Sequence, residues 1–307
     1  MNTSQKELKM YKELLKILYC PICKSEFKVK EIELMNDEII EGTLICEEGH
    51  KYSIHKGVID FCSEEQSMAN QWSEAYKEND YESYDEQIES MKSDKEKAQQ
   101  KKVLDHLVNE LSKMEKGTIV DIASGRGMLL TQLAANVKDS INIIATDLSF
   151  DVLMYDRLKL KKIRPNLHVD FIACDAANMP FKSGSIDSAV SFFGIANMLG
   201  IVESGMKEAS RILNDNGKLL DAFLLIREAS KGFEALKHVC AENKITGAEK
   251  AYLESNVTQM HKNYFGNVHC DIVCEDIKDM EENRIDLLPY PGEWFAEVIY
   301  QCTKIVL

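Results

Sequence analysis

From residue 118 onward, short apolar runs alternate with stretches whose apolar residues recur at helical spacing. Unbroken apolar runs of this length are typical of strands that are buried on both faces of a parallel sheet. The predicted strands cover residues 119–122, 141–146, 168–174, 186–193 and 218–226, and the predicted helices between them cover 128–135, 151–160 and 202–213. Their regular alternation predicts an α/β fold with a doubly wound, mostly parallel sheet.

The first 117 residues have a different pattern. Helical periodicity at 8–19 is followed by two β-like stretches at 27–34 and 42–46. Helix formers surround Trp72 and Tyr76, an acidic stretch at 79–87 is predicted to be mobile or a lid, and an amphipathic helix is predicted at 95–114. We therefore predict a small domain at 1–62, a helical connector or lid at 63–117, and a main domain at 118–307 with a helical insertion at 228–262.

The composition is ordinary for a soluble globular protein, with 45% hydrophobic and 29% charged residues among 307. No apolar run approaches the ~18 residues of a membrane span, and the N-terminus lacks a signal-peptide core. We expect a cytoplasmic protein with no membrane partner. The formal net charge of −14 argues against a large phosphate-binding face and disfavours nucleic acid as a partner.

A metal site is predicted in the N-terminal domain, because a CxxC pair is followed some twenty residues later by CxxxH. Such a set supplies the four ligands of a structural Zn²⁺ site, and metal binding supplies folding energy to a domain with little core. The predicted ligands are Cys20, Cys23, Cys46 and His50. A second CxxC would put cysteine at Gly49, so His50 is chosen, with His55 and Cys62 as alternatives; a redox pair at the CxxC is disfavoured by the absence of a thioredoxin-like pattern.

Two zinc-ribbon families resemble this domain. The Cys-Pro-Ile-Cys knuckle with Cys46-x3-His50 resembles the ribbon of bacterial rRNA guanine-N1 methyltransferases, and residues 52–61 resemble the small zinc-ribbon activators of tRNA methyltransferases. Residues 1–62 hold nine lysines and eleven acidic residues. Because a ribbon that binds RNA phosphates is normally basic, we predict that this one packs or docks a partner.

The segment 118–127 predicts a nucleotide-binding element, because a buried strand passes through a small-residue turn into a helix N-terminus. Gly125 and Gly127 allow the backbone to approach a ligand. A dinucleotide fingerprint would place a third glycine at 130, where the chain has Leu130.

Three carboxylates at strand ends distinguish a site for a cationic nucleoside cofactor from a site for a dinucleotide. Asp121, Asp147 and Asp175 end the first, second and third predicted strands. Ligands of a parallel sheet bind beyond these ends. S-adenosylmethionine is cationic and has no pyrophosphate, so a site lined by carboxylates suits it and repels a dinucleotide.

These residues resemble the class I S-adenosylmethionine-dependent methyltransferases. Val-Asp-Ile-Ala-Ser-Gly-Arg-Gly is similar to their first motif, Ala-Thr-Asp147-Leu-Ser to the second, and Cys-Asp175-Ala-Ala-Asn-Met-Pro-Phe to the adenine-side motif; residues 208–220 resemble the helix, glycine turn and fifth strand. The resemblance implies a Rossmann-like seven-stranded methyltransferase sheet in the order 3-2-1-4-5-7-6. It also implies an antiparallel last strand, for which residues 294–302 are suited, and a sixth strand at 266–274.

The resemblance also implies roles for individual residues. Gly125 and Gly127 would pass close to the methionine moiety, and Asp121 would orient its amino group. Asp147 would take both ribose hydroxyls, Asp175 would meet the adenine amine, and Phe192 or Phe193 would line the methyl side. The implied cofactor-binding set is Asp121, Ala123, Ser124, Gly125, Gly127, Asp147, Leu148, Asp175, Ala176 and Phe192, in which Ala123 replaces a common glycine.

The acceptor is not identified by the sequence. Methyl transfer needs chiefly alignment of nucleophile, methyl and sulfur, so no catalytic residue is predicted. His238, His261 and His269 are the candidate bases, and surface or packing roles are expected for them. After the fourth strand the chain lacks the Asn/Asp-Pro-Pro-Tyr/Phe loop of many base and glutamine methyltransferases. A methyltransferase for a small molecule or peptide is predicted; an rRNA guanine-N1-type enzyme and a non-catalytic cofactor-binding scaffold are the alternatives.

Overall fold

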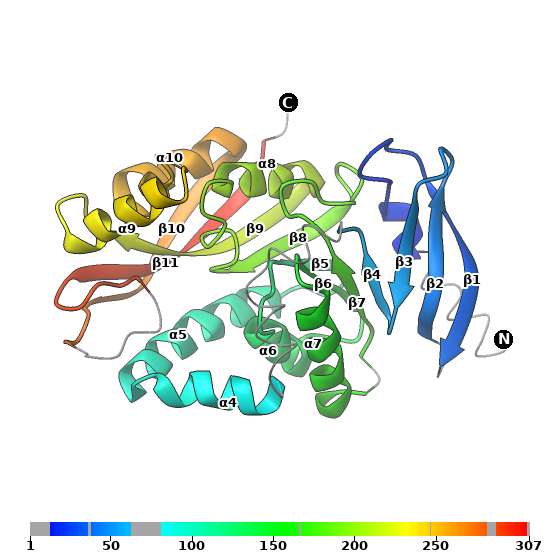
Figure 1. The fold of residues 1–307 in the computed structure, drawn as a ribbon, viewed down its shortest axis with the longest axis horizontal. Helices are drawn as coiled ribbons and strands as arrows, with labels where there is room; N and C mark the ends of the chain where they lie inside the picture. The colour runs from blue at the N-terminus through cyan, green and yellow to red at the C-terminus, as the bar shows by residue number, and fades with distance from the viewer. Residues whose placement is uncertain are drawn as a thin grey trace.

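In the computed structural model, the described residues form one sheet of eleven strands, with helices on both faces (Figure 1). The structure describes residues 13–35, 38–62, 81–165, 167–245, 247–280 and 287–305. The strands are β1 (Phe27–Met35), β2 (Glu38–Cys46), β3 (Lys51–His55), β4 (Val58–Asp60), β5 (Gly117–Ile122), β6 (Ile141–Asp147), β7 (Val169–Ala173), β8 (Ile186–Phe192), β9 (Leu213–Ile226), β10 (Phe265–Ile277) and β11 (Trp294–Lys304). The helices are α4 (Tyr81–Met91), α5 (Asp94–Leu111), α6 (Met128–Asn136), α7 (Phe150–Ile163), α8 (Val202–Ile212), α9 (Lys231–Glu242), the 3₁₀ helix η1 (Ala248–Tyr252) and α10 (Glu254–Tyr264).

The last seven strands have the predicted topology. Their order across the sheet is β7-β6-β5-β8-β9-β11-β10, which is 3-2-1-4-5-7-6 when they are numbered along the chain. β11 is antiparallel to both of its neighbours, whereas β5 to β9 pair in parallel. The predicted order and the antiparallel seventh strand are confirmed.

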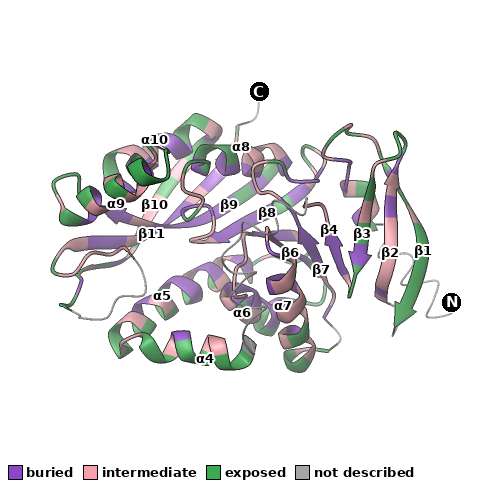
Figure 2. Ribbon diagram, viewed as in Figure 1, coloured by how far each residue is buried: buried purple, intermediate pink, exposed green. Residues whose placement is uncertain are grey.

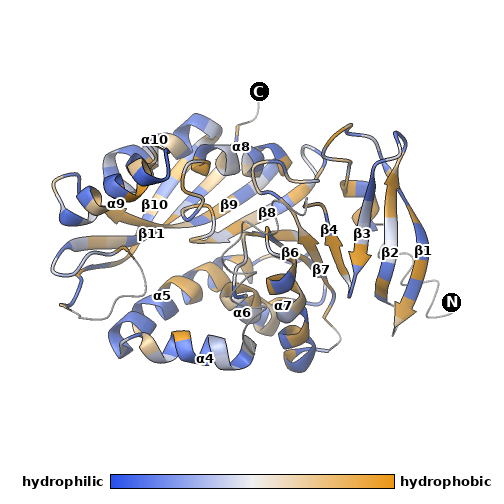
Figure 3. Ribbon diagram, viewed as in Figure 1, coloured by the Kyte–Doolittle hydropathy of each residue, from blue (hydrophilic) through white to orange (hydrophobic). Residues whose placement is uncertain are grey.

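The central strands are apolar on both sides because each face of the sheet has its own core. Successive residues of a strand point to opposite faces, and Ile119 packs in one apolar cluster while Val120 packs in the other. The helices α5, α6 and α7 cover one face, and α8, α9 and α10 cover the other (Figures 1 and 2). Coloured by hydropathy, the central strands are mainly apolar, and polar residues lie on the outer sides of the helices (Figure 3).

The N-terminal ribbon continues the main sheet. β1 to β4 form an antiparallel ribbon, and β4 then pairs in parallel with β7, placing Ile59 beside Ile172. Phe61 extends this pairing, since its N–H donates to the carbonyl of Ala173 over 2.8 Å. The ribbon is thus joined to the main domain by backbone hydrogen bonds.

The connector is helical where it is described. α5 begins at Ser93 with a capping box, in which the Ser93 hydroxyl accepts from the Glu96 N–H and the Glu96 carboxylate accepts from the Ser93 N–H. The stretch in which we predicted a mobile segment or lid is helical from Tyr81, as α4. The predicted helix around Trp72 and Tyr76 and the first part of the predicted helix at 8–19 lie outside the described residues.

The insertion at 228–262 contains α9, η1 and the greater part of α10. None of the described helices combines the length and apolar character that a bilayer span requires.

Candidate functional site

The carboxyl ends of β5, β6, β7 and β8 lie at one edge of the sheet, because these strands pair in parallel. Asp121 is the next-to-last residue of β5, Asp147 ends β6, Asp175 follows β7 by two residues, and Phe192 ends β8. The fold therefore brings the separately predicted residues to a single edge. Ligands of doubly wound sheets bind at this edge.

Asp121 is a buried carboxyl group without a compensating donor. It is 1% exposed, and neither of its carboxylate oxygens has a hydrogen-bond partner among the described residues. Burial and the nearby charge of Asp147 raise the pKa of Asp121 to about 8. A buried acid of this kind costs free energy unless a cation or donor reaches it. An ammonium group on a ligand fits this requirement.

The turn between β5 and α6 is open on its ligand side. Ala123, Gly125 and Gly127 have φ values of 53°, 55° and 66°, in the left-handed region where glycine is unstrained and alanine is not. A Cβ on Gly125 would meet nothing within 4 Å. The hydroxyl of Ser124 is buried without a partner among the described residues, and α6 begins at Met128 without a side-chain cap. Free N–H groups at a helix start are available to a ligand.

Asp147 ties the second strand to this turn. Its Oδ2 accepts from the Gly125 N–H over 2.9 Å, and its Oδ1 accepts from the Ser149 N–H over 2.9 Å. These bonds oppose burial, which raises the pKa of Asp147 overall. Leu148 follows and is partly exposed. The predicted ribose acid thus also holds the turn that is predicted to bind the methionine end.

The loop after β8 packs directly on the turn. The rings of Phe192 and Phe193 lie edge to face with centroids 4.9 Å apart, and Phe193 has a φ of 59°, which is strained for a bulky residue. Gly194 follows, and a Cβ there would lie 2.5 Å from the Ile122 carbonyl oxygen and 2.7 Å from that of Ala123. Glycine at 194 allows this close approach.

We expect Gly194→Ala to lower the free energy of unfolding by about 1–3 kcal/mol, because the added methyl group overpacks a rigid backbone contact. Urea denaturation monitored by circular dichroism measures the change. Gly266→Ala in β10 is the control, since a Cβ there has its nearest contact at 3.4 Å. Equal stabilities of the two variants would contradict the expected contact.

Asp175 borders a cleft between the ribbon and the sheet edge. Its Oδ1 accepts from the Ala177 N–H over 2.8 Å, and Ala176 between them is partly exposed. The cleft has a volume of about 730 Å³, and Cys62, Cys174 and Asp175 form its wall on the side of the main sheet. Sequence reasoning missed this cleft, because it exists only where β4 meets β7.

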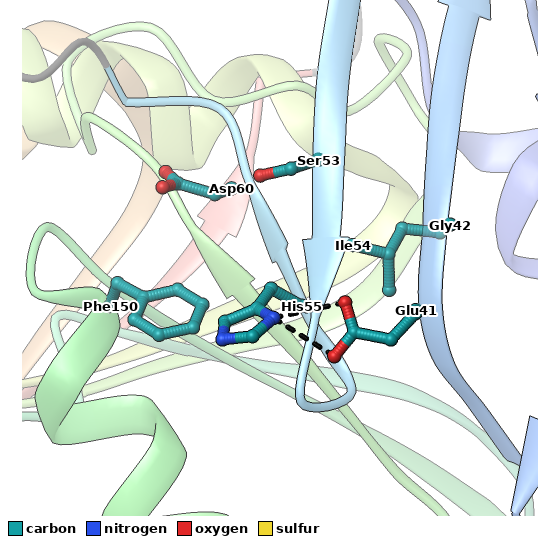
Figure 4. Close-up of a pocket in the computed structure, with 7 residues that line it drawn as sticks. All are labelled: Glu41, Gly42, Ser53, Ile54, His55, Asp60 and Phe150. Atoms are coloured by element: carbon teal, nitrogen blue, oxygen red, sulfur yellow. Dashed lines mark hydrogen bonds and ion pairs between the residues drawn. The ribbon is translucent and has the colours of Figure 1, made fainter. Parts of the chain in front are cut away.

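A second cleft of about 460 Å³ adjoins the first, since Ser53 and Asp60 line both (Figure 4). Figure 4 shows His55 between Glu41 and Phe150. Its Nδ1 is 2.9 Å from a Glu41 carboxylate oxygen, and its ring stacks on that of Phe150 with centroids 5.7 Å apart.

The four predicted metal ligands lie together in the ribbon. One ligand atom from each of Cys20, Cys23, Cys46 and His50 lies within 4.8 Å of all the others. The Sγ atoms of Cys20 and Cys46 are 3.6 Å and 3.3 Å from Nδ1 of His50, and those of Cys23 and Cys46 are 3.6 Å apart. Tetrahedral Zn²⁺ with bonds of about 2.0–2.3 Å requires ligand separations of about 3.3–3.8 Å. The donor set and its spacing therefore fit Zn²⁺.

Hydroxyl groups lie beside two of the cysteines. The Tyr52 hydroxyl is 3.3 Å from the Cys20 Sγ, and the Ser25 hydroxyl is 3.1 Å from the Cys23 Sγ. Hydrogen bonding by Ser25 lowers the pKa of Cys23 to about 6. The alternative ligands lie elsewhere: His55 contacts Glu41, and Cys62 lies 3.5 Å from the Leu148 carbonyl oxygen.

The three histidines that were considered as bases do not gather at the predicted cofactor edge. His261 is 0% exposed; its Nε2 is 3.2 Å from Oδ2 of Asp221, and its ring stacks on Tyr300 with centroids 4.0 Å apart. His238 and His269 are exposed. These positions agree with the surface and packing roles expected for them.

Asp156 of α7 was not singled out in the sequence. It is 1% exposed, and a Cβ on Gly127 would lie 2.4 Å from its Oδ1, so its carboxyl group packs directly against the turn. The sequence did contain a sign of this role, because Asp156 falls on the buried face of α7, which is otherwise formed by Val152, Leu153 and Leu160.

Comparison with protein families gives two matches. Residues 66–233 match the ubiE/COQ5 methyltransferase family, and residues 12–57 match the Trm112p-like proteins. The first match contains β5 to β9 and the predicted cofactor residues. The second contains the four residues of the Cys/His cluster.

Individual relatives match the main domain. The ubiquinone/menaquinone biosynthesis C-methyltransferase UbiE of Geobacter sp. (strain M21) is 28% identical over 104 residues, 34% of this chain and 44% of that protein. The protein of the same name from Rickettsia prowazekii is 36% identical over 107 residues, 33% of this chain and 42% of its own length. The chain thus spans less than half the length of these curated relatives.

Solved structures share the fold. The MccD protein aligns with a TM-score of 0.50 and 14% identity over 66% of this chain and 96% of its own. A Haemonchus contortus phosphoethanolamine N-methyltransferase 2, solved with S-adenosylhomocysteine, aligns with a TM-score of 0.50 and 15% identity over 66% of this chain and 53% of its own.

Proposed function

The chain belongs to the ubiE/COQ5 methyltransferase family, and from this premise we propose that it transfers the methyl group of S-adenosylmethionine to a small-molecule acceptor. We further propose that the N-terminal ribbon holds a structural Zn²⁺. The observation that carries the first proposal is Asp121, a buried acid without a partner among the described residues, next to an open glycine turn. The ammonium group of the cofactor would satisfy this acid.

The proposed binding roles divide the cofactor along the sheet edge. Asp121 and the turn from Ser124 to Gly127 would hold the methionine end, whereas Asp147 would bind the ribose and Asp175 the adenine amine. Phe192 would stand on the methyl side. When bound, the cofactor supplies an electrophilic methyl group on a sulfonium. The chain's own contribution is to hold the donor, exclude water and fix the line of approach.

We propose a small aromatic acceptor. The matched curated relatives are named as C-methyltransferases of ubiquinone and menaquinone biosynthesis. The paired rings of Phe192 and Phe193 at the end of β8 support such an acceptor, since aromatic side chains favour contact with a planar ring. No residue is assigned as a base.

Incubation with S-adenosylmethionine and a panel of quinols, phenols and short peptides tests the proposal. We expect one methyl group to be added to a quinol or phenol, as detected by mass spectrometry, with one equivalent of S-adenosylhomocysteine formed. Binding of the cofactor without transfer to any member of a broad panel would favour the scaffold alternative. Absence of cofactor binding at micromolar concentrations would contradict the proposed function.

Affinity for S-adenosylmethionine should rise with pH. The pKa of Asp121 is about 8 in the free protein, and a bound ammonium group favours the carboxylate, so binding releases a proton. We expect affinity to increase between about pH 6 and about pH 7.5 by at most about tenfold per pH unit. Calorimetry across this range measures it, and Asp121→Asn should bind more weakly and without this dependence.

Folding stability depends on pH in the opposite direction to cofactor affinity. Because the folded-state pKa of Asp121 is raised, its contribution to stability is greatest at acidic pH and declines as the pH rises towards 8. Without cofactor, Asp121→Asn should therefore unfold at a higher urea concentration than the wild type at about pH 7.5. A less stable Asn variant would show that the acid has a partner in solution.

A macromolecular acceptor is the second candidate, and the Trm112p-like match of residues 12–57 favours it. The acidic balance of residues 1–62 argues against RNA. Transfer of radiolabel from the cofactor to RNA or protein in a cell extract, with none to small molecules, would favour this candidate.

A further inference from the structure

Arg126 lies between the two glycines of the turn, and its side chain contacts a group of charges. Only 11% of the side chain is exposed. Nη2 is 3.0 Å from Oε1 of Glu89, and Nη1 is 3.6 Å from Oδ1 of Asp85. Both acids belong to α4, where a spacing of four residues places them on the same face.

Lys92 also pairs with Glu89, over 2.7 Å, and another cation joins the group from α7. The Nζ atom of Lys159 forms an ion pair with Asp85 and donates to the Arg126 carbonyl oxygen over 3.1 Å. It also lies 3.5 Å from Oδ1 of the buried Asp156, against which Gly127 packs. Arg126 is therefore held at both its guanidinium and its carbonyl.

Ion pairs link α4 to the turn and to α7. Ile88 is its one buried residue among those whose exposure is described, whereas ion pairs join Asp85 to Lys159 and Glu89 to Arg126. Partly buried ion pairs fix geometry more than they add stability, and removing one partner leaves the other charge uncompensated.

We propose that Arg126 is a positioning residue and that Asp85 and Glu89 of α4 are its counter-charges, so that α4 fixes the turn and tunes its preference for a cationic cofactor. The inference rests on the proposed function. Without counter-charges, Arg126 and Lys159 beside the turn would repel a cofactor that carries a sulfonium and an ammonium group. Neutralised by the α4 acids, they hold the backbone without that repulsion.

The charge of the ligand separates this role from a merely structural one. S-adenosylmethionine carries a net charge of +1, whereas its product S-adenosylhomocysteine has lost the sulfonium and is neutral overall. A loosened turn would weaken both ligands equally. Arg126 without its α4 counter-charges would weaken the cationic ligand more.

The test compares full-length variants by calorimetry with both ligands. In Asp85→Asn/Glu89→Gln, affinity for S-adenosylmethionine should fall about tenfold and the preference over S-adenosylhomocysteine about fivefold. In Arg126→Met, affinity for both ligands should fall about tenfold without that loss of preference. Arg126→Lys should recover part of the lost affinity. Asp105→Asn/Glu110→Gln on α5 is the matched control, because it removes two carboxylates from ion pairs away from the turn and should stay within about twofold of wild type.

Amide hydrogen exchange without ligand gives the second readout. Residues 124–128 should exchange about tenfold faster in Arg126→Met than in the wild type. Unchanged exchange, or equal weakening of the two ligands in the double variant, would overturn the inference. A wild type that binds neither ligand, with faster exchange in Arg126→Met, would instead overturn the proposed function and leave the positioning role in place.

Discussion

Asp147→Asn is expected to lower the affinity for S-adenosylmethionine about a hundredfold, because the substitution removes the charged acceptor that is predicted to hold both ribose hydroxyls. It also weakens the support of the glycine turn, since both carboxylate oxygens accept backbone N–H groups, from Gly125 and Ser149. Calorimetric titration with S-adenosylmethionine measures the loss.

Unfolding must be separated from loss of binding in this variant. Burial raises the pKa of Asp147, so a neutral amide relieves a buried charge, and we expect a melting temperature within a few degrees of the wild type. Asp170→Asn on β7 is the control, because the Asp170 carboxylate lies 3.1 Å from Nε2 of His168 and holds no part of the glycine turn. An Asp147→Asn protein that binds the cofactor normally would refute the ribose assignment.

Removal of the metal should have the second large effect. We expect the wild type to contain one equivalent of zinc and Cys46→Ser to contain much less, with residues 27–60 becoming sensitive to protease. Zinc in such small sites contributes of the order of 10 kcal/mol to folding, so the ribbon should not stay folded without it. Atomic emission spectroscopy and limited proteolysis measure the two outcomes.

Cys62→Ser is the matched control for the metal site. Cys62 was an alternative ligand in the sequence, but its Sγ lies beside the Leu148 carbonyl oxygen, outside the Cys/His cluster. We expect this variant to keep its zinc. Loss of zinc from Cys62→Ser, or retention by Cys46→Ser, would contradict the proposed ligand set.

The sequence predicted the features that depend on local patterns. Runs such as 141–146 are apolar because both faces of the sheet are covered, and the run length alone indicates a buried strand. The Cys/His spacing predicted a cluster that lies within 4.8 Å. The order of the motifs then predicted that Asp121, Asp147 and Asp175 would lie at the same edge of the sheet.

Features that depend on contacts between distant segments were missed. β4 has three residues, too few for a periodic signal, and its partner β7 lies in another predicted domain. The pairing of Arg126 with Asp85 and Glu89 was also missed, because the acidic stretch at 79–87, which overlaps α4, gave no sign of its partner. The positive φ of Ala123 and the close approach of Gly194 to its carbonyl oxygen were also missed, since neither leaves a periodic signal in the sequence.

The pairing of β4 with β7 has a consequence for the order of events during synthesis. Ile59 pairs with Ile172, which the ribosome adds 113 residues later, a delay of about 6–23 s at about 5–20 residues per second. Until then the nascent ribbon presents β4 as an unpaired strand edge, open to association with other chains. The four proposed zinc ligands, at positions 20 to 50, are also synthesised before β7, so a ribbon that binds the proposed metal would be folded on the nascent chain as a template for the rest of the sheet.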